Sequence, residues 1–460
     1  MYILRDYQEI SVVKGLEILR NKTPKRNLVV LPTGAGKSIV IAEIAKQLDE
    51  PIIILQPSKE LLEQNYQKYI DVGGEATMYS ASVGVKEISK VTFATIGSIK
   101  KEVQAFKDMG LTRIIIDEAH IGVKSGSQLR SFLKDTGIRN VLGLTATPFV
   151  LTSGMSGSEL KMLTKVQHKL FSDISYVYQM HDMIQNKYWT PLQYKVVNQD
   201  TTRLRVNTSG SDFTEDSMKD FYENNDIESQ IVEYTDKCIQ HGKKAILVFV
   251  PSIHEAEILS AKISYARSVS SLTPKKERDE IISDFKSGKT KVVINVGILT
   301  TGFDYPELDA IILARSTMSF ALYYQMVGRG VRLHPSKEKT LVIDLSENFN
   351  RFGRVETFSV EFVEDYGWGL FKGNCLISNY PIEAKHRPTK DTLSSKYVRA
   401  VTIDHEPGKG VLTFGKYKGK SLAHTLEKDK GYLVWLYENF NFYKNQAKLK
   451  LEIGILLNVC

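Results

Sequence analysis

The stretch "LVVLPTGAGKS", residues 28–38, places a short apolar run directly before a glycine-rich loop, and a segment with helical periodicity follows at 38–48. Glycines let the backbone curl so that successive N–H groups point at a phosphate chain, and the new helix adds its positive N-terminal dipole. In such a loop the lysine reaches the β- and γ-phosphates and the serine hydroxyl binds Mg²⁺. The strict pattern has a glycine where this chain has Leu31. The predicted phosphate-binding residues are Leu31, Pro32, Thr33, Gly34, Ala35, Gly36, Lys37 and Ser38.

A second short run, "IIIDEAH" at residues 114–120, takes three β-branched residues straight into two carboxylates and an imidazole. In a parallel sheet this strand would end beside the phosphate loop. Asp117 is then predicted to hold Mg²⁺ together with Ser38, since the ion prefers oxygen ligands. Glu118 is predicted to polarise the water that attacks the γ-phosphate. A solvated strand end would also explain the two acids, but it would not explain the upstream loop.

Apolar runs and helical segments alternate twice along the chain. The first set of runs lies at residues 28–31, 52–55, 91–94, 114–116 and 141–144. The second set lies at residues 245–250, 291–296, 310–313 and 340–345. The runs do not alternate polar with apolar residues, as expected for strands that are covered on both faces. This pattern predicts an α/β protein with two parallel sheets.

The remaining segments suggest how these units are divided. We expect a first domain at residues 1–195, a second at 196–365, a connector at 366–404 and a small accessory module at 405–460. Residues 151–217 are predicted to be loop-like, with "LTSGMSGSE" at their start and a helix near 180–187.

Composition limits the class of protein only loosely. The 460 residues contain 61 Lys and Arg against 53 Asp and Glu, a net charge of +8 that fits a polyanionic partner but occurs in many unrelated proteins. Three widely spaced cysteines argue against disulfides and zinc. The N-terminus lacks the apolar core of a signal peptide, and no apolar run is long enough to cross a bilayer. We therefore expect a cytoplasmic protein without a membrane partner.

Eight short motifs in a fixed order carry a family resemblance. In chain order they are "LRDYQ" (4–8), "PTGAGKS" (32–38), "QPSKELLEQ" (56–64), "TFATIGSI" (92–99), "DEAH" (117–120), "LTATP" (144–148), "VGILTTGFDYP" (296–306) and "YYQMVGRGVR" (323–332). Together they resemble the superfamily 2 DEAD/DEAH-type helicases, most of all the compact branch-migration and repair DNA helicases of bacteria and their phages. The resemblance implies two tandem RecA-like (P-loop) domains, ATP and Mg²⁺ as cofactors, and the cytosol of a bacterium or phage-infected cell.

The resemblance also implies roles for residues outside the phosphate loop. Gln8 and Arg5 would contact adenine, and Gly302 and Asp304 would line the nucleotide cleft from the second domain. The residues implied to couple the nucleotide to the nucleic acid are His120, Thr145 and Thr147. The residues implied to complete catalysis are Gln325, Arg329 and Arg332.

The two arginines have a physical rationale. A planar, permanently charged guanidinium stabilises charge on a transferred phosphoryl group well. Because Arg329 and Arg332 would come from the other domain, hydrolysis would require the domains to close. The alternative is that the two side chains form a solvated basic face on a helix.

The expected substrate is forked, branched or single-stranded DNA, with RNA less favoured. Backbone contacts are predicted from motif position at Ser58, Lys59, Thr95 and Thr300, each of which could equally be a helix cap or a surface residue. Two other functions stay open: an RNA helicase, and an ATP-gated clamp that binds duplex without separating strands.

The C-terminal stretch at residues 410–440 resembles a small domain found at the end of some exonucleases and phage proteins. It interleaves aromatic and cationic residues, namely Phe414, Lys416, Tyr417, Lys418 and Lys420. Such a pattern would suit base stacking beside phosphates. It would equally suit a hairpin whose rings form a small core and whose lysines are solvated.

Overall fold

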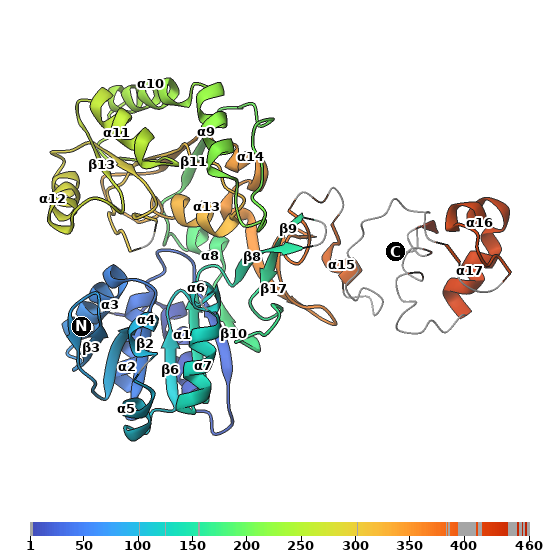
Figure 1. The fold of residues 1–460 in the computed structure, drawn as a ribbon, viewed down its shortest axis with the longest axis horizontal. Coiled ribbons are helices and arrows are strands. Elements are labelled where there is room, and N and C mark those ends of the chain that lie inside the picture. The colour runs from blue at the N-terminus through green and yellow to red at the C-terminus, as the bar shows by residue number, and fades with distance from the viewer. Residues whose placement is uncertain are drawn as a thin grey trace.

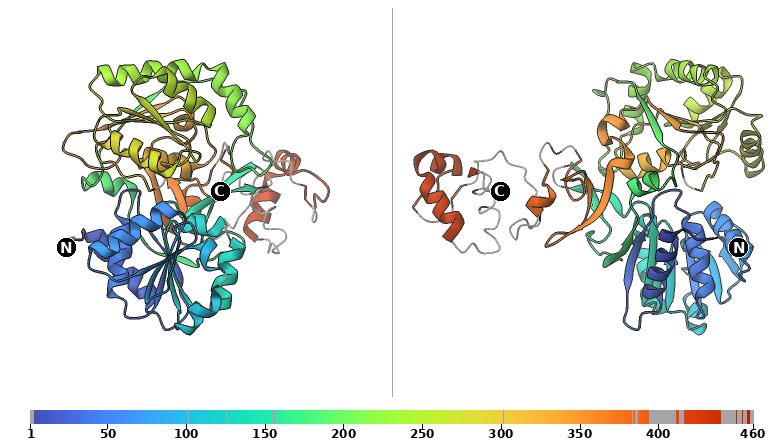
Figure 2. Two further views of the ribbon diagram at one scale, coloured as in Figure 1. Left: turned by 60° about the vertical axis from the view of Figure 1, so that its left-hand side comes forward. Right: turned by 180° about the vertical axis from the view of Figure 1, so that it is seen from behind.

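The structure is a computed structural model. It describes residues 3–100, 102–124, 126–154, 157–300, 302–382, 384, 387–393, 411–412, 416–439, 449, 453 and 456–457. Figure 1 shows two α/β units that lie one against the other, the first in blue to cyan and the second in green to orange, and the further views agree (Figure 2). The predicted α/β fold with two parallel-sheet units is thereby confirmed.

The first unit is built on an eight-stranded sheet of order β10-β1-β7-β6-β2-β5-β3-β4. Its strands are β1 (Arg26–Val30), β2 (Ile52–Gln56), β3 (Thr77–Ser80), β4 (Val85–Lys86), β5 (Val91–Thr95), β6 (Arg113–Ile116), β7 (Asn140–Thr145) and β10 (Asp173–Val177). All neighbours pair in parallel except β3 with β4. Every residue of β2 and of β7 is buried, which explains why the apolar runs do not alternate.

Helices flank this sheet in two contacting groups. Helices α1, α2 and α3 contact one another in order, and α7 contacts α5 and α6. The helices are α1 (Asp6–Leu19), α2 (Lys37–Gln47), α3 (Lys59–Asp71), α4 (Ile96–Ile99), α5 (Val103–Asp108), α6 (Ala119–Lys124) and α7 (Gly126–Thr136). The carboxyl ends of β1 and β6 meet at one edge of the sheet, where the phosphate loop and the two acids follow them.

The second unit is an all-parallel, six-stranded sheet of order β11-β16-β15-β12-β14-β13. Its strands are β11 (Leu192–Val196), β12 (Ile246–Phe249), β13 (Ala266–Val269), β14 (Val292–Asn295), β15 (Ala310–Leu313) and β16 (Thr340–Asp344). Its helices are α9 (Glu215–Asn224), α10 (Ile227–Gln240), α11 (Ile253–Lys262), α12 (Lys275–Lys286), α13 (Phe320–Val327) and α14 (Asn348–Phe352). The predicted boundary at 195/196 falls inside β11, so this sheet begins at Leu192.

Two antiparallel elements differ from the predicted loops. The described residues of the stretch "LTSGMSGSE", 151–154 and 157–159, lie in a hairpin of β8 (Phe149–Gly154) with β9 (Gly157–Met162), not in a loop. The small polar residues of this stretch are typical of a loop. Leu151 and Leu160, however, are buried and lie opposite each other in the hairpin. A second sheet joins β17 (Phe358–Val363), β18 (Gly367–Lys372) and β19 (Cys375–Leu376), so ordered structure continues past the predicted boundary at 365/366.

Few elements remain. They are α8 (Met180–Gln185), the 3₁₀ turn η1 (Val355–Thr357), α15 (Lys390–Leu393), α16 (Leu422–Lys428) and α17 (Lys430–Asn439). The last two helices enclose a small core of their own, which contains Leu412, Leu422, Leu433, Leu436 and Ile453. The predicted connector beyond residue 393, which is residues 394–404, and Phe414 lie outside the described residues. Within the described ranges, no helix is both long enough and apolar enough to span a membrane.

Candidate functional site

The phosphate loop has the shape that its sequence predicts. Strand β1 ends at Val30, helix α2 begins at Lys37, and Gly34 and Gly36 between them have φ of 79° and 82°. These left-handed conformations favour glycine. A Cβ at Gly36 would also lie 2.5 Å from the Gln8 side-chain nitrogen. The left-handed conformation is what favours glycine there, and a Cβ would in addition displace the Gln8 amide group.

The amide groups of this loop are available to a ligand. Among the described residues, no main-chain or side-chain acceptor pairs with the N–H groups of Gly34, Gly36, Lys37 or Ser38. Four such donors at the start of a helix form an anion-binding site. The loop therefore fits a phosphate chain.

The two acids after β6 lie next to the loop. Lys37 Nζ is 3.4 Å from Glu118 Oε1, and both side chains are mostly buried. Burial first, and then the neighbouring charge of Glu118, raises the pKa of Asp117 to about 6. Burial would also raise the pKa of Glu118, but Lys37 and His120 outweigh it and lower that pKa. Glu118 is therefore the acid held in its ionised form by the protein itself.

Two further observations bear on the chemistry of these acids. Asn65 Nδ2 donates to Asp117 Oδ2 at 2.9 Å, which fixes the carboxylate from α3. Glu118 Oε2 is buried without a hydrogen-bond partner in the described part of the chain, and Glu118 itself has a φ of 45°. This ionised carboxylate oxygen lies 3.5 Å from His120 Nδ1 and accepts no hydrogen bond within the described residues. Held in a sparsely populated backbone conformation, it fits a role in orienting water.

These donors fit the group that the family uses. Lys37 and the loop amides would hold the phosphates of ATP, and Ser38 with Asp117 would hold Mg²⁺. Bound ATP supplies the phosphoanhydride bond that is broken. The protein supplies position, charge and the oriented water.

The predicted adenine residues form a cluster at the start of α1. Gln8 accepts from the Arg5 amide at 3.0 Å, and its Nε2 donates to the Ala35 carbonyl at 2.8 Å. Tyr7 donates to the same carbonyl at 2.9 Å, and the Arg5 guanidinium lies 4.3 Å from the ring centre of Tyr188. Gln8 is thus tied to the phosphate loop, and its contact with adenine stays a prediction.

The predicted coupling residues form a connected chain. His120 Nδ1 lies 3.0 Å from Thr145 Oγ1, which accepts from the Thr147 amide at 3.0 Å. The Thr145 carbonyl accepts from the Leu31 amide. On its other side, His120 Nε2 lies 3.3 Å from Gln325 Nε2 of the second unit. The chain therefore runs from the phosphate loop of one unit to α13 of the other.

Both arginines after α13 reach the same cleft. Arg329 donates to the Phe303 carbonyl at 2.7 Å, and burial first, then Arg332, lowers its pKa to about 10, so it stays charged at neutral pH. Arg332 pairs with Asp304 at 3.0 Å and donates across the interface to the Gly34 carbonyl at 3.4 Å. Arg329 is bonded inside the second unit and Arg332 reaches the phosphate loop, so the two side chains do not form a solvated basic face on a helix; their contact with the nucleotide stays a prediction. Gly302, which has a φ of 73°, directly precedes Phe303 and Asp304, the partners of the two arginines in the second unit.

Sequence reasoning missed two buried hydrogen bonds to the phosphate loop. The Thr33 amide donates to the Tyr324 hydroxyl at 3.0 Å, and Trp189 Nε1 donates to the Thr33 carbonyl at 2.9 Å. Both rings are fully buried. A Cβ at Gly328 would lie 2.8 Å from the Thr33 side chain, so glycine lets α13 approach the loop. Tyr324 stands inside a quoted motif and could have been suspected, whereas Trp189 carries no sequence signal.

The four predicted backbone contacts have structural roles of their own. Ser58 caps α3 by accepting from the Leu61 amide, and Lys59 donates to the Ser82 carbonyl. Thr95 Oγ1 lies 2.9 Å from Ser98 Oγ, and Thr300 Oγ1 donates to the Gly297 carbonyl at 2.8 Å. Ser58 and Lys59 also line a cavity between the units. Their contact with nucleic acid stays a prediction.

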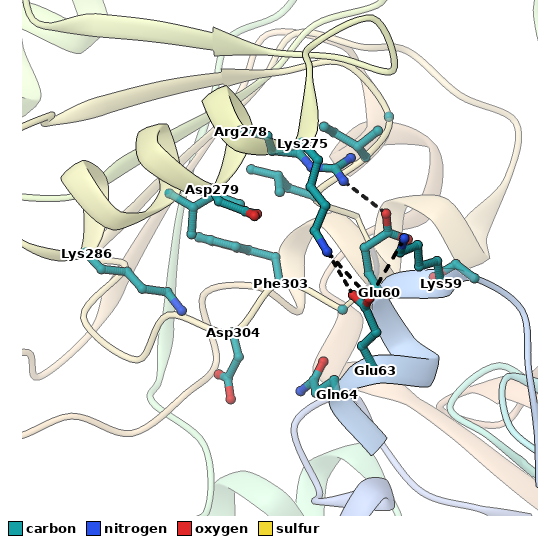
Figure 3. Close-up of a pocket in the computed structure, with 16 residues that line it drawn as sticks. Lys59, Glu60, Glu63, Gln64, Lys275, Arg278, Asp279, Lys286, Phe303 and Asp304 are labelled. Atoms are coloured by element: carbon teal, nitrogen blue, oxygen red, sulfur yellow. Dashed lines mark hydrogen bonds and ion pairs between the residues drawn. The ribbon is translucent and has the colours of Figure 1, made fainter. Parts of the chain in front are cut away.

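That cavity, of about 460 Å³, lies between α3 and α12 (Figure 3). Two ion pairs cross it: Arg278 to Glu60 at 3.2 Å, and Lys275 to Glu63 at 3.5 Å. Figure 3 shows both cations reaching down from α12 toward the carboxylates on α3. The cleft therefore offers cations that a phosphate backbone could use, each now paired with a carboxylate.

Comparison with known families agrees with this geometry. A family described as "Type III restriction enzyme, res subunit" matches residues 1–150, and "Helicase conserved C-terminal domain" matches residues 230–334. "Exodeoxyribonuclease X-like C-terminal" matches residues 412–441, which confirms the resemblance of the accessory module.

Similar proteins point the same way. The putative ATP-dependent helicase IRC3 of Saccharomyces cerevisiae is 28% identical over 74% of this chain, which spans only 51% of that protein. The 51.5 kDa protein of a Lactococcus phage is 28% identical over 72% of this chain and 68% of its own length. The ATP-dependent DNA helicase uvsW of Enterobacteria phage T4 is 22% identical over 74% of this chain and 68% of its own length.

A solved structure supports the fold. The ATP-dependent Type ISP restriction-modification enzyme LlaBIII bound to DNA superposes with a TM-score of 0.57 at 19% identity, covering 75% of this chain and 28% of that one. Two family matches in tandem, helicase relatives including viral ones, and a site assembled from both units together show that the chain belongs to superfamily 2 of the helicases.

Proposed function

We propose that this chain is an ATP-driven DNA translocase or helicase that acts on forked, branched or single-stranded DNA. The observation that carries the proposal is the composition of the site. Lys37, Asp117 and Glu118 come from the first unit, while Arg332 from the second donates to the loop at Gly34. A site that needs both units links each hydrolysis event to their relative motion.

The protein's own groups would divide the work as follows. Lys37 and the amides at the start of α2 would bind the phosphates, and Asn65 would keep Asp117 oriented toward the metal. Ionised Glu118 would orient the attacking water and accept its proton. Arg329, half-buried and charged, would stabilise the negative charge that develops on the transferred group.

DNA is proposed as the track because two of the sequence relatives name DNA, uvsW and the DNA 3'-5' translocase XPB2 of Sulfurisphaera tokodaii. A solved structure of similar fold, Dbp5 of S. cerevisiae, is bound to RNA, so RNA is the alternative that the test below separates. The net charge of +8 and the cations of α12 fit a polyanion that is gripped through its backbone. Because phosphates repeat along a strand and bases do not, such a grip permits stepping.

The test compares ATP hydrolysis with single-stranded, forked and four-way DNA and with RNA, together with displacement of a labelled strand from the fork. We expect DNA to stimulate hydrolysis more than RNA does, with forked or four-way DNA the most active, and the labelled strand to be released. Stronger stimulation by RNA would identify an RNA helicase instead. Hydrolysis on DNA without displacement or movement would identify a clamp.

A further inference from the structure

The Lys337 side chain lies against the loop that carries both arginines of the candidate site. We call residues 328–332 the arginine loop. Lys337 Nζ donates to the Gly330 carbonyl of this loop at 2.9 Å. It also donates to the Leu308 carbonyl at 2.8 Å and to Thr340 Oγ1 at 3.3 Å. An ammonium group has three N–H donors, so each of them has an acceptor here.

The Leu308 carbonyl ends a second segment, residues 303–308, which holds the two guanidinium groups. One arginine donates to the Phe303 carbonyl at 2.7 Å, and the other pairs with the Asp304 carboxylate at 3.0 Å. We call residues 303–308 the orienting segment. Lys337 therefore joins the main chain of the arginine loop to the segment that the arginine side chains contact.

Thr340, the first residue of β16, supports the same carbonyl of the arginine loop. Its hydroxyl donates to the Gly330 carbonyl at 2.7 Å, and its side chain is fully buried. A Cβ at Gly330 would lie 2.5 Å from Thr340 Cγ2 and 3.0 Å from Ile311 Cδ1. Glycine therefore lets the arginine loop lie directly on the sheet, where its buried carbonyl depends on donors from the protein.

The charge of Lys337 is kept although the side chain is half-buried. Burial lowers the pKa of Lys337 to about 8; Asp309 opposes this shift, whereas Lys243 and Arg332 add to it. The side chain therefore remains mostly protonated at neutral pH. A half-buried ammonium group must be held by hydrogen bonds, and in return it fixes the main-chain atoms that accept them.

We propose that Lys337 is a positioning residue for ATP hydrolysis, because its ammonium group fixes the arginine loop against the orienting segment. The inference rests on the proposed function, in which the guanidinium groups stabilise charge on the transferred phosphoryl group. Without the ammonium group, the two segments would shift relative to each other and the arginines would leave their productive positions. ATP binding depends on Lys37 and the amides of the first unit, so it should change little.

The first test measures kcat and KM for ATP in the presence of the nucleic acid that stimulates hydrolysis most. Lys337→Met keeps the apolar stem and removes the ammonium group. It should lower kcat about 10- to 100-fold and leave KM within about twofold, because misplaced catalytic groups act on the chemical step.

Lys165→Met is the matched control. Lys165 is also half-buried, and burial lowers its pKa to about 8 as well. Its ammonium group, however, lies 3.1 Å from the ring centre of Tyr366 and not at the arginine loop. Lys165→Met should therefore hydrolyse ATP like the unmodified chain.

Thr340→Val tests the same contact without removing a charge. Valine keeps the shape of the buried side chain but has no hydroxyl to donate to the Gly330 carbonyl. This variant should lower kcat about tenfold, again with KM within about twofold. If Lys337→Met does not fold, Thr340→Val decides by the same criterion.

A double-mutant cycle separates positioning from general stability. Arg329→Ala with Arg332→Ala should lower the rate about 10³-fold or more, and single-turnover conditions with excess enzyme keep the slow rate measurable. Adding Lys337→Met to this arginine variant should lower the rate by less than about twofold, because Lys337 acts through the arginines.

The inference is overturned if Lys337→Met keeps kcat within about twofold of the unmodified chain while the arginine variant loses activity. It is also overturned if Lys337→Met lowers the rate by the same factor with and without the arginines, since that result would mean a structural role. A full rate in the arginine variant itself would overturn the proposed role of the two guanidinium groups, which is a failure of the proposed function.

Discussion

Replacing Tyr324 with phenylalanine would remove a single hydroxyl from the contact between the two units. That oxygen accepts the hydrogen bond of the Thr33 amide at 3.0 Å, in a place that water does not reach. A buried donor left without its partner costs about 1–3 kcal/mol, which corresponds to about fivefold to 150-fold in an equilibrium constant. The penalty falls on the contact between the two units, because the donor and the acceptor belong to different units.

We therefore expect Tyr324→Phe to lower kcat/KM for ATP about tenfold or more at saturating DNA, in a steady-state phosphate-release assay. The neighbouring Tyr323 provides a matched control. Its hydroxyl is equally buried, but it donates at 2.9 Å to the Gly353 carbonyl inside the second unit. Tyr323→Phe should lower the melting temperature while leaving ATP kinetics near normal.

The comparison between these two variants shows whether Tyr324 acts through its contact with the phosphate loop or through general stability. If both reduce kcat/KM equally, the effect of Tyr324 is general destabilisation and not a contact with the phosphate loop. If Tyr324→Phe behaves like the unmodified chain, Trp189 and the arginines suffice to hold the loop, and the reasoning fails.

Three further changes probe the acids. Glu118→Gln should cut turnover about 10²–10⁴-fold while retaining ATP binding, measured with a fluorescent analogue; full turnover would remove Glu118 from the mechanism. Asn65→Ala should raise the Mg²⁺ concentration needed for half-maximal hydrolysis about 10- to 100-fold, because it frees Asp117; an unchanged magnesium titration would contradict this. Glu60→Gln with Glu63→Gln should tighten DNA binding about twofold to thirtyfold at low salt, since each exposed ion pair on α12 is worth about 0.2–1 kcal/mol; weaker binding would show that the carboxylates do not compete with phosphate.

The sequence predicted those parts of the site that depend on one unit alone. Lys37 and Glu118 follow strands β1 and β6, and parallel strands deliver their carboxyl ends to one edge, so motif and fold together place them. Ser58 shows what a motif cannot distinguish. A serine at this position is expected both for capping α3 and for contacting a nucleic-acid backbone. The β8–β9 hairpin was not predicted because serine and glycine are typical of turns. They outweigh the short alternation of apolar and polar residues in its strands.

Contacts between the units could not be predicted in the same way. Trp189 lies between the two sheets, in a stretch with no motif, and its partner is a main-chain carbonyl that any residue would offer. Its role depends on how the units face each other, which periodicity does not encode. Arg332 was predictable only because the resemblance implied that it crosses the interface.

Two kinds of contact join the units, and they should respond differently to salt. The ion pairs from α12 to Glu60 and Glu63 are partly exposed, so ions screen them and nucleic acid can replace them. The hydrogen bonds of Tyr324 and Trp189 to Thr33 are buried and neutral, so dissolved ions screen them very little. Raising the salt concentration should therefore weaken DNA binding steeply and raise KM for ATP much less, because ATP is held by a few mostly buried charges and the neutral bonds keep the loop in place. A parallel rise of both would mean that one set of contacts serves both ligands.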